Sequence, residues 1–253
     1  MTKKHDIIWL DTVDSTNNEA KRRLQDLDNL SVLSALEQTA GRGQRGNTWS
    51  AGPGENLTFS IVMKFGEGGV PEVRALDQFV ISEIAALSVV DALAEYGIEA
   101  KVKWPNDIYV GNRKICGILI ENSLRDTTLA SSIIGIGLNV NQTVFDPSIP
   151  NPTSMSIINA PADLDRLLDD IMTIFGSYCT RHLNITGGYT RLRRLYLAQL
   201  WRMEEESSYI DTTSGATFRG RIKGISGIGH LLVEDTEKGE LKEFAFKEIG
   251  YII

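Results

Sequence analysis

Two arginines stand in the most glycine-rich stretch of the chain, which runs from residue 38 to residue 60. It reads QTAGRGQRGNTWSAGPGENLTFS, and Arg42 and Arg45 lie among its glycines. Glycine lets the backbone approach a ligand closely, and arginine presents a planar fork of donors suited to phosphate and carboxylate. The composition predicts a basic loop that closes over an anion, and an ordinary surface loop is the alternative.

Three of these glycines, Gly41, Gly43 and Gly46, fit the spacing GxGxxG. A dinucleotide-binding site with that spacing needs a helix that opens at the last glycine. Here residues 52–54 are Gly-Pro-Gly, which cannot continue a helix. The chain also has no HRD or DFG motif, so the spacing indicates neither a dinucleotide fold nor a protein kinase.

A second group of candidate residues lies at 101–122, KVKWPNDIYVGNRKICGILIEN. Two β-rich runs flank the Gly-Asn pair at 111–112, a good two-residue hairpin turn, and Lys114 begins the second run. Pro105 breaks the first run, so residues 104–107 should be irregular. Lys114 could neutralise a bound anion, or it could simply extend from the strand into solvent.

Hydroxyl groups and strand glycines offer further places for a ligand. Thr16 with Glu19 fits a capping box at the start of a helix, whereas the hydroxyls of Ser15 and Thr16 could instead face a polar ligand group. Gly135 and Gly137 leave one face of a strand without side chains. Such a gap allows the close approach of a ligand or of a packed helix.

The remaining pattern is that of an α+β protein. The predicted strands are at residues 7–13, 31–37, 57–65, 101–110, 113–122 and 132–141, and the predicted helices are at 16–27, 72–96, 162–183 and 189–201. Gly97 is placed as the C-cap of the clearest helix. From residue 207 short strands alternate with turns, which indicates a small antiparallel barrel. We therefore predict a larger domain over 1–206 and a barrel over 207–253.

Composition limits the kind of protein. The 253 residues carry a formal net charge of −7 and are 42% apolar, which is typical of a soluble globular chain. No apolar run is long enough for a membrane span, and the N-terminus has no signal-peptide pattern. Cys116, Cys179 and the three histidines form no metal-ligand spacing, and no serine triad can be drawn. We expect a cytoplasmic protein without membrane binding and without a broad nucleic-acid surface.

These motifs, in this order, resemble those of the biotin–protein ligases, also called biotin–[acetyl-CoA-carboxylase] ligases. The resemblance covers nearly the whole chain. Its motifs are VDSTN at 13–17, QTAGRGQRGNTW at 38–49, KWPND at 103–107, RKICGIL at 113–119 and IGIGLNVN at 134–141. Five motifs in the family's order and spacing are far more specific than any one of them.

The resemblance implies a fold and an activity. The implied fold is a mixed β-sheet flanked by helices, similar to that of class II aminoacyl-tRNA synthetases, with a small C-terminal SH3-like β-barrel. In the implied reaction, the carboxylate of biotin attacks the α-phosphate of ATP to give biotinyl-5′-AMP and pyrophosphate. A lysine of a biotin carboxyl carrier protein then displaces AMP. Mg²⁺ is expected with ATP, although no carboxylate cluster in the sequence identifies its ligands.

The resemblance also implies which residues are functional, because each one occupies a matching position in one of the five motifs. The implied catalytic residues are Lys114, Arg42 and Asp107. The implied biotin-binding residues are Ser15, Thr16, Asn17, Gln38, Gly41, Arg42, Gly43, Gln44, Lys114, Gly117, Gly135 and Gly137. The implied ATP-binding residues are Arg42, Arg45, Trp49, Asn106, Lys114 and Asn139. Lys114 would lie between the biotin carboxyl oxygen and the phosphate, and Asp107 would orient or deprotonate the incoming lysine.

The chain also departs from some relatives. Some bacterial members have arginine where this chain has Gln44 and Asn47, so the loop should hold the adenylate less tightly. Members that also repress transcription have a DNA-binding domain before the ligase core, and only about a dozen residues precede Asp14 here, so we expect a ligase that does not bind DNA. An exposed sheet edge could support a homodimer. The alternatives are a lipoate– or octanoate–protein ligase, whose Arg-Arg-x-x-Gly-Gly-Gly motif is missing, and a non-catalytic biotin- or nucleotide-binding module.

Overall fold

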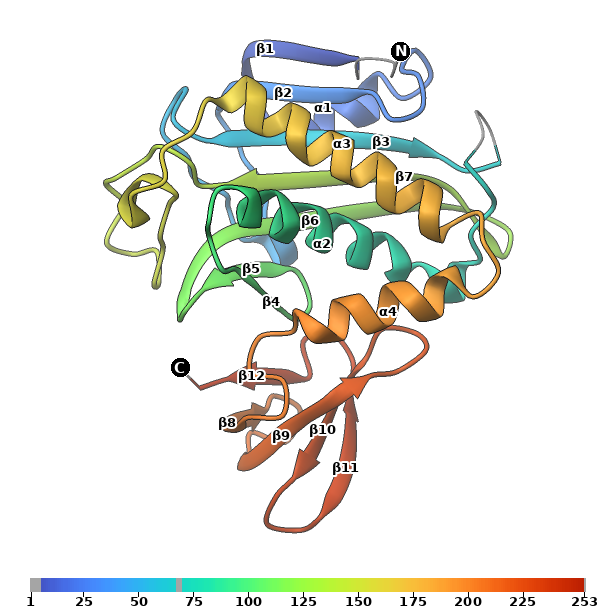
Figure 1. Ribbon diagram of the computed structural model, residues 1–253, viewed down its shortest axis with the longest axis vertical. Helices are drawn as coiled ribbons and strands as arrows, with labels where there is room; N and C mark the ends of the chain where they lie inside the picture. Colours follow the sequence, from blue (N-terminus) through green and yellow to red (C-terminus); the bar gives the residue numbers. More distant parts are fainter. Residues whose placement is uncertain (1–5, 67–69, 253) are drawn as a thin grey trace.

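Within residues 6–66 and 70–252, which the computed structural model describes, the chain forms two β-sheets and four α-helices (Figure 1). The helices are α1 (Thr16–Arg22), α2 (Phe79–Glu95), α3 (Leu164–His182) and α4 (Gly188–Ala198). The larger sheet contains β1 (Ile7–Val13), β2 (Val32–Gln38), β3 (Leu57–Lys64), β4 (Lys101–Lys103), β5 (Asp107–Val110), β6 (Arg113–Arg125) and β7 (Thr128–Leu138).

The larger sheet has the strand order β1-β2-β3-β7-β6-β5-β4 and is mixed. β1 pairs with β2 in parallel, and all other neighbours in this sheet are antiparallel. In Figure 1, α2 and α3 cross in front of the sheet and α1 lies behind it. The prediction of an α+β fold with a mixed sheet flanked by helices is confirmed.

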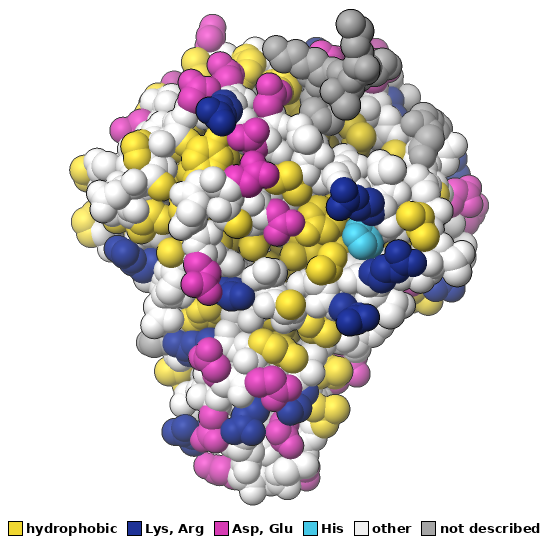
Figure 2. All heavy atoms as spheres, in the orientation of Figure 1, with side chains coloured by type: hydrophobic (Ala, Val, Ile, Leu, Met, Phe, Trp, Pro, Cys, Tyr) yellow, Lys and Arg dark blue, Asp and Glu magenta, His cyan; other side chains and the backbone are white. Residues whose placement is uncertain are grey.

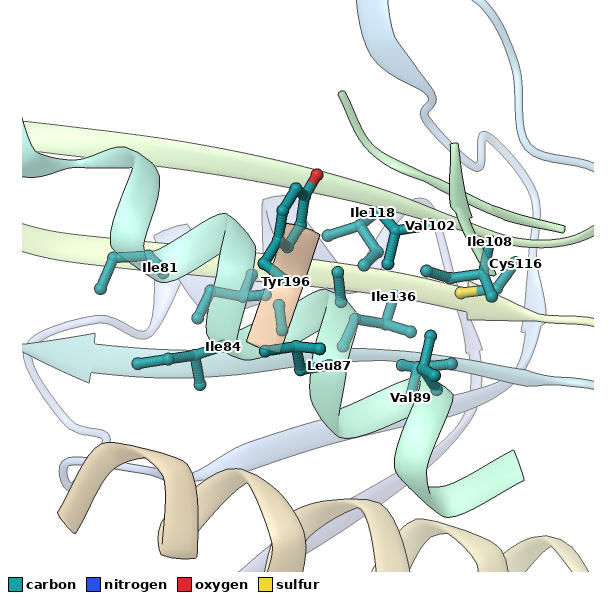
Figure 3. Close-up of a cluster of buried hydrophobic side chains, with 14 of the residues drawn as sticks. Ile81, Ile84, Leu87, Val89, Val102, Ile108, Cys116, Ile118, Ile136 and Tyr196 are labelled. Atoms are coloured by element: carbon teal, nitrogen blue, oxygen red, sulfur yellow. The ribbon is translucent and has the colours of Figure 1, made fainter. Parts of the chain in front are cut away.

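The main core lies between α2 and the larger sheet (Figure 3). Ile84 and Leu87 of α2 pack over Ile118 and Ile136 of the central strands, and all four side chains are buried. α3 and α4 pack against α2 from the outside, so α2 is buried nearly all round. A smaller core under α1 contains Ala20, Leu27, Leu33, Val62 and Ile133. The α1 side of the sheet is therefore only partly filled by apolar side chains.

The helix predicted at 72–96 begins at Phe79, so its predicted start is wrong. The preceding residues pair with the β6–β7 turn instead, and Leu129 N donates to Val73 O at 2.8 Å. Val73 is buried by that contact, whereas Leu76 is 69% exposed. The position of Leu76 matches helical spacing, but backbone pairing with β7 decides the local structure.

Several predicted boundaries can be compared directly with the structure. Gly97 follows α2 with φ of +75°, and Gly111 has φ of +58° in the two-residue turn between β5 and β6, so both predicted turns are confirmed. Residues 104–106 separate β4 from β5, as Pro105 indicates, but the predicted irregular tract is one residue too long, because Asp107 begins β5. α1 ends at Arg22, so its predicted extension to residue 27 is wrong.

The C-terminal residues form an open antiparallel sheet, so the predicted closed barrel is wrong. Its strands are β8 (Glu206–Asp211), β9 (Thr217–Ile225), β10 (Leu231–Asp235), β11 (Glu240–Phe244) and β12 (Ile249–Tyr251). Their order is β11-β10-β9-β8-β12, and within the described residues the two end strands do not pair with each other. Sequence reasoning did not identify β8 as a strand.

The open sheet packs against the larger domain instead of closing on itself. The indole N–H of Trp104 donates to Gly229 O at 2.9 Å. The Phe246 ring centre lies 5.2 Å from that of Trp104 and 6.1 Å from that of Phe79. Tyr251 of β12 contacts the larger domain as well, with its ring centre 5.7 Å from that of Trp201, and it also packs on Tyr209 of β8 with 5.5 Å between ring centres.

The helical face of the molecule carries charges of both signs (Figure 2). Acidic and basic side chains are interspersed over the larger domain and over the narrower C-terminal sheet below it. Across residues 6–66 and 70–252, none of the helices is both long enough and apolar enough to span a membrane.

A buried ion pair strengthens the contact between the domains. Glu83 of α2 is 1% exposed, and Arg193 of α4 donates to its carboxylate. Arg193 Nη1 also donates to the carbonyl oxygens of Ile225 at 3.2 Å and Ser226 at 2.6 Å. Burial raises the pKa of Glu83 to about 7, although Arg193 acts to lower it. One guanidinium thus joins α2, α4 and the C-terminal sheet.

We expect Arg193→Met to destabilise the protein by about 3–5 kcal/mol, because it leaves Glu83 buried without its counter-charge. The folded-state pKa of Glu83 exceeds the ordinary value of 4.5, so the folded protein binds this proton more tightly than the unfolded chain does. The resulting contribution to the free energy of unfolding is complete below about pH 4.5 and is lost as the pH rises toward about 7. Without Arg193 the folded-state pKa rises further, so the stability difference from the unchanged protein should widen above about pH 7. Urea unfolding at two pH values on either side of 7 measures both effects.

The double variant Glu83→Gln Arg193→Met is the control, because it has no buried carboxyl group to titrate. Its stability should lack the extra pH dependence of the single variant. An Arg193→Met loss that is equal at low and high pH would contradict the assignment of the effect to Glu83.

Candidate active site

A cavity of about 300 Å³ lies on the α1 side of the larger sheet. It is enclosed by the start of α1, the β4–β5 tract, β12, and residues 39–56, here called the glycine-rich loop. The predicted site residues that line it are Ser15, Thr16, Asn17, Gln38, Arg42, Gly43, Gln44, Trp49, Asn106, Asp107, Lys114, Gly117, Gly135 and Gly137. Motifs that are far apart in the sequence therefore meet in one hollow of ligand size.

The position of Lys114 depends on an irregularity in β6. Side chains along a strand alternate between faces, but the β5–β6 register shifts by one residue, which leaves Ile115 without a partner opposite. Ile115 and Cys116 are consecutive, yet both are fully buried in the main core. The bulge therefore moves Lys114 to the face of β6 that carries Gly117, which is the cavity face.

Lys114 forms an ion pair at the cavity wall. Its Nζ lies 2.6 Å from Asp107 Oδ1, and Asp107 is the first residue of β5. The Lys114 side chain is 31% exposed and the Asp107 side chain 19%. Nζ also lies 5.8 Å from the ring centre of Trp49. The alternative in which Lys114 only extends into solvent is contradicted.

The strand glycines allow two close contacts. A Cβ on Gly137 would come within 2.3 Å of the Trp49 indole, and a Cβ on Gly117 within 3.1 Å of it. A Cβ on Gly135 would come within 2.3 Å of Asn17 Oδ1. The strand face without side chains therefore leaves room for Asn17 at the start of α1 and for Trp49 of the glycine-rich loop. The indole N–H of Trp49 is buried and has no hydrogen-bond partner among the residues described.

Hydrogen bonds order the polar end of the cavity at the start of α1. Gln38 Oε1 accepts from the Thr16 backbone N–H at 2.8 Å and lies 3.2 Å from the Thr16 hydroxyl. Ser60 Oγ lies 2.6 Å from Asn17 Oδ1 and 2.8 Å from Thr16 Oγ1. Ser15 is the N-cap, and its side chain makes no capping hydrogen bond. The predicted capping box is wrong, because the Thr16 backbone N–H donates to Gln38 and not to Glu19.

Arg42 binds Glu121 of β6. Its Nη1 and Nη2 each donate to one carboxylate oxygen of Glu121 at 3.0 Å, and Nη1 also donates to Asn18 Oδ1 at 2.9 Å. Asn17 Nδ2 donates to the same carboxylate at 2.9 Å. Burial acts to raise the pKa of Glu121, but the hydrogen bonds from Asn17 and Arg42 outweigh it and keep that pKa below its usual value. Both terminal nitrogens of Arg42 thus contact protein groups.

Three predicted site residues are not placed on the cavity wall. Asn139 is 4% exposed, and its amide donates to Thr153 O at 2.9 Å. Gly41 packs against the loop backbone, where a Cβ would come within 2.3 Å of Trp49 O. The side chain of Arg45 lies outside the described part of the structure. The ligand roles predicted for these three residues stay predictions.

Sequence reasoning missed several residues at or next to the cavity. Lys103 lines it, with Nζ 4.8 Å from the ring centre of Tyr109 and 5.0 Å from that of Tyr251. Burial lowers the pKa of Lys103. Lys103 belongs to the KWPND motif, so its motif position could have identified it. Tyr251, Glu121 and Ser60 reach the site only through the fold, and no local pattern in the sequence marks them.

The described residues provide no ready-made metal site. Among them, no group of three or more His, Cys, Asp or Glu side chains could hold a metal ion. Asp107 is the acidic side chain in the cavity wall, and it already binds Lys114. An ion such as Mg²⁺ would therefore need most of its ligands from a bound substrate and water.

Comparison with known proteins finds similar sequences over most of the chain. A family model described as "Biotin/lipoate A/B protein ligase family" matches residues 9–139. The chain is 28% identical to the bifunctional ligase/repressor BirA of Bacillus spizizenii, over 91% of this chain and 70% of that protein. It is 31% identical to the biotin–[acetyl-CoA-carboxylase] ligase of Paracoccus denitrificans, over 87% of this chain and 90% of that protein.

Solved structures extend the likeness to the fold. The biotin protein ligase from Aquifex aeolicus in complex with biotin and ATP superposes with a TM-score of 0.77 at 27% sequence identity, and the match covers 97% of each chain. The likeness includes the C-terminal sheet as well as the larger domain, because so little of either chain is left out. On the family match, the relatives and the shared fold together, the chain belongs to the biotin/lipoate A/B protein ligase family.

Proposed function

We propose that this chain is an ATP-dependent biotin–protein ligase, which activates biotin as biotinyl-5′-AMP and transfers it to a lysine of a biotin carboxyl carrier protein. The observation that carries the proposal is the Lys114–Asp107 pair, which shares one cavity with the strand glycines and the glycine-rich loop. The Aquifex aeolicus ligase in complex with biotin and ATP has the same fold, which supports the same substrates here.

Lys114 carries the first step. The biotin carboxylate and the α-phosphate of ATP are both anions, so their approach needs a cation between them. Asp107 holds Lys114 Nζ at the cavity wall before either ligand arrives, which reduces the reorganisation needed on binding. A carboxylate oxygen of biotin attacks the α-phosphorus, and the bond to pyrophosphate breaks.

The ureido ring of biotin is placed at the polar end of the cavity, next to α1. Side chains that offer donors and acceptors to the ring are Ser15, Thr16, Asn17 and Gln38. Loop residues that would cover the ring are Gly41, Arg42, Gly43 and Gln44. The glycines Gly117, Gly135 and Gly137 would let the ring and the tail pass close to the backbone of β6 and β7 once the Trp49 indole has moved away from Gly117 and Gly137.

ATP is placed between the glycine-rich loop and the β4–β5 tract. The proposed contacts are Arg42, Arg45, Trp49, Asn106, Lys114 and Asn139. Asn106 is held in place by its amide, which donates to Ile118 O at 2.8 Å. Asn139 would act indirectly, because it binds Thr153, whose backbone N–H donates to Lys114 O at 2.8 Å. Mg²⁺ would arrive with the nucleotide and be held mainly by phosphate oxygens.

Asp107 serves the second step. The incoming lysine of the carrier is an ammonium group at neutral pH and must lose a proton before it attacks. Asp107 orients this amine or accepts its proton, the amine attacks the acyl carbon, and AMP leaves. Closure of the glycine-rich loop would keep water from the mixed anhydride.

Several wider properties remain part of the proposal. The natural partner would be a biotin carboxyl carrier domain, and the reaction would take place in the cytoplasm. A homodimer, the lack of DNA binding, and weaker retention of the adenylate by Gln44 and Asn47 stay predictions. The domain boundary between residues 206 and 207 also stays a prediction, and β8 begins at Glu206.

A direct assay tests the function. The protein is mixed with ATP, Mg²⁺, biotin and a biotin carboxyl carrier domain, and protein-bound biotin is detected on a blot. We expect label on the carrier with biotin and no modification when lipoate replaces biotin. Modification by lipoate alone would favour the lipoate ligase instead, and ligand binding without any transfer would favour a non-catalytic module.

We expect Lys114→Ala to lower the rate of adenylate formation by roughly 10²-fold or more, because two anions would then meet without the cation. Pyrophosphate release in the absence of carrier measures this step. Lys238→Ala, which changes an exposed lysine of the C-terminal sheet, is the matched control and should retain full activity. A Lys114→Ala enzyme as fast as the control would exclude the proposed role.

We expect Asp107→Ala to slow transfer more than adenylate formation, since only transfer needs a proton acceptor for the amine. Transfer is followed in a single turnover from added biotinyl-5′-AMP to the carrier, and adenylate formation from pyrophosphate release. Asp107→Asn keeps the shape of the side chain and should show the same selective loss. Equal losses in both steps would mean that Asp107 acts only by holding Lys114.

A further inference from the structure

Glu121 does not line the cavity, but it binds two residues that do. Beyond the bulge, alternation along β6 places Gly117, Leu119 and Glu121 on the same face as Lys114. Glu121 is paired in register with Ile133, which belongs to the small core under α1. Its carboxylate therefore faces the side of the sheet where the glycine-rich loop and α1 meet.

Within the described part of the chain, every hydrogen-bond partner of this carboxylate is a donor. One oxygen accepts from Asn17 Nδ2 at 2.9 Å and from Arg42 Nη1 at 3.0 Å, and the other accepts from Arg42 Nη2 at 3.0 Å. A carboxylate has only acceptor atoms, so it suits three donors better than an amide would. One side chain thereby joins β6, α1 and the glycine-rich loop, which lie far apart in the sequence.

The same bonds set the direction of the Asn17 amide. Its nitrogen faces Glu121, and its oxygen lies 2.6 Å from Ser60 Oγ. Turning the amide over would place Oδ1 against the carboxylate, which repels it. Glu121 therefore determines which atom of Asn17 is presented beside Gly135, at the polar end of the cavity.

On these contacts, we propose that Glu121 is a positioning residue that anchors the glycine-rich loop through Arg42 and orients Asn17, so that the biotin ring site exists before biotin arrives. The inference rests on the proposed function for its ligand, although the anchoring itself does not. It also gives Arg42 a second task besides the proposed contact with ATP, because both terminal nitrogens of its guanidinium bind Glu121 of β6 before a ligand is present.

The effect should be local order and not global stability. Arg42 is 41% exposed and Glu121 31%, and exposed ion pairs contribute little to the stability of a whole domain. The two ends of the glycine-rich loop bind the larger domain through Ala40 N to Asp14 O at 2.8 Å and Gly54 N to Leu36 O at 2.9 Å. Its middle is held by backbone bonds within the loop, such as Gly43 N to Asn47 O at 2.8 Å and Trp49 N to Gly41 O at 3.0 Å. Those two amide protons report whether the loop is held.

Hydrogen exchange on the ligand-free protein tests the anchoring. Glu121→Gln should raise the exchange rates of the Gly43 and Trp49 amides by roughly tenfold, the scale of one charge-assisted hydrogen bond. Amides of α2 and the thermal midpoint should stay as in the unchanged protein. Glu95→Gln, at an exposed position of α2, is the matched control. Unchanged exchange at both loop amides would overturn the inference.

Biotin titration by calorimetry without ATP tests the consequence. We expect Glu121→Gln and Arg42→Gln each to weaken biotin binding by roughly tenfold, and the double variant to be no weaker than either, because both changes break one unit. Fully additive losses would overturn the proposal that Glu121 acts through Arg42. If the unchanged protein failed to bind biotin, the proposed function would fall, while the exchange result would still decide the anchoring.

Discussion

The extra residue in β6 is the constraint on which the site depends. Because side chains alternate along a strand, a single bulge at Ile115 decides which residues face the main core and which face the cavity. Cys116 and Ile118 are buried under α2, whereas Lys114, Gly117 and Glu121 face α1 and the glycine-rich loop. Without the bulge, the lysine would point into an apolar core, where an unpaired ammonium is costly.

The two faces of the larger sheet have different tasks. The α2 side is filled by apolar side chains from α2 and the central strands, which gives the site a rigid support (Figure 3). The α1 side carries glycines, amides and charged pairs. The polar groups there are held mainly by one another: Gln38 by Thr16, Asn17 by Ser60 and Glu121, and Asp107 by Lys114.

Much of this arrangement could be predicted from the sequence, because motif position identifies residues that bear chemistry. The lysine at 114, the carboxylate at 107 and the paired glycines at 135 and 137 all reach the cavity as expected. Local patterns were less informative where backbone pairing decides the outcome. Leu76 fits the spacing of a helix, but the residue is exposed and lies before the start of α2. Thr16 fits a capping box, but its backbone N–H donates to Gln38 instead.

Contacts between distant segments were the hardest to foresee. The sequence around Glu121 does not indicate that its carboxylate binds Arg42, because the two residues meet only after β6 and the glycine-rich loop are packed together. The C-terminal sheet gives a similar lesson. Its strand lengths indicate a closed barrel, but its two end strands do not pair within the described residues, and Trp104 of the larger domain contacts it at Phe246 and Gly229.

The place of β12 in the cavity wall has a consequence for synthesis. Ile249, Gly250 and Tyr251 line the cavity, although all other lining residues come from the first 137 positions of the chain. A ribosome must therefore reach residue 251 before this wall can form. A nascent chain whose larger sheet has already folded still lacks one side of its cavity until β12 has been synthesised and packed in place.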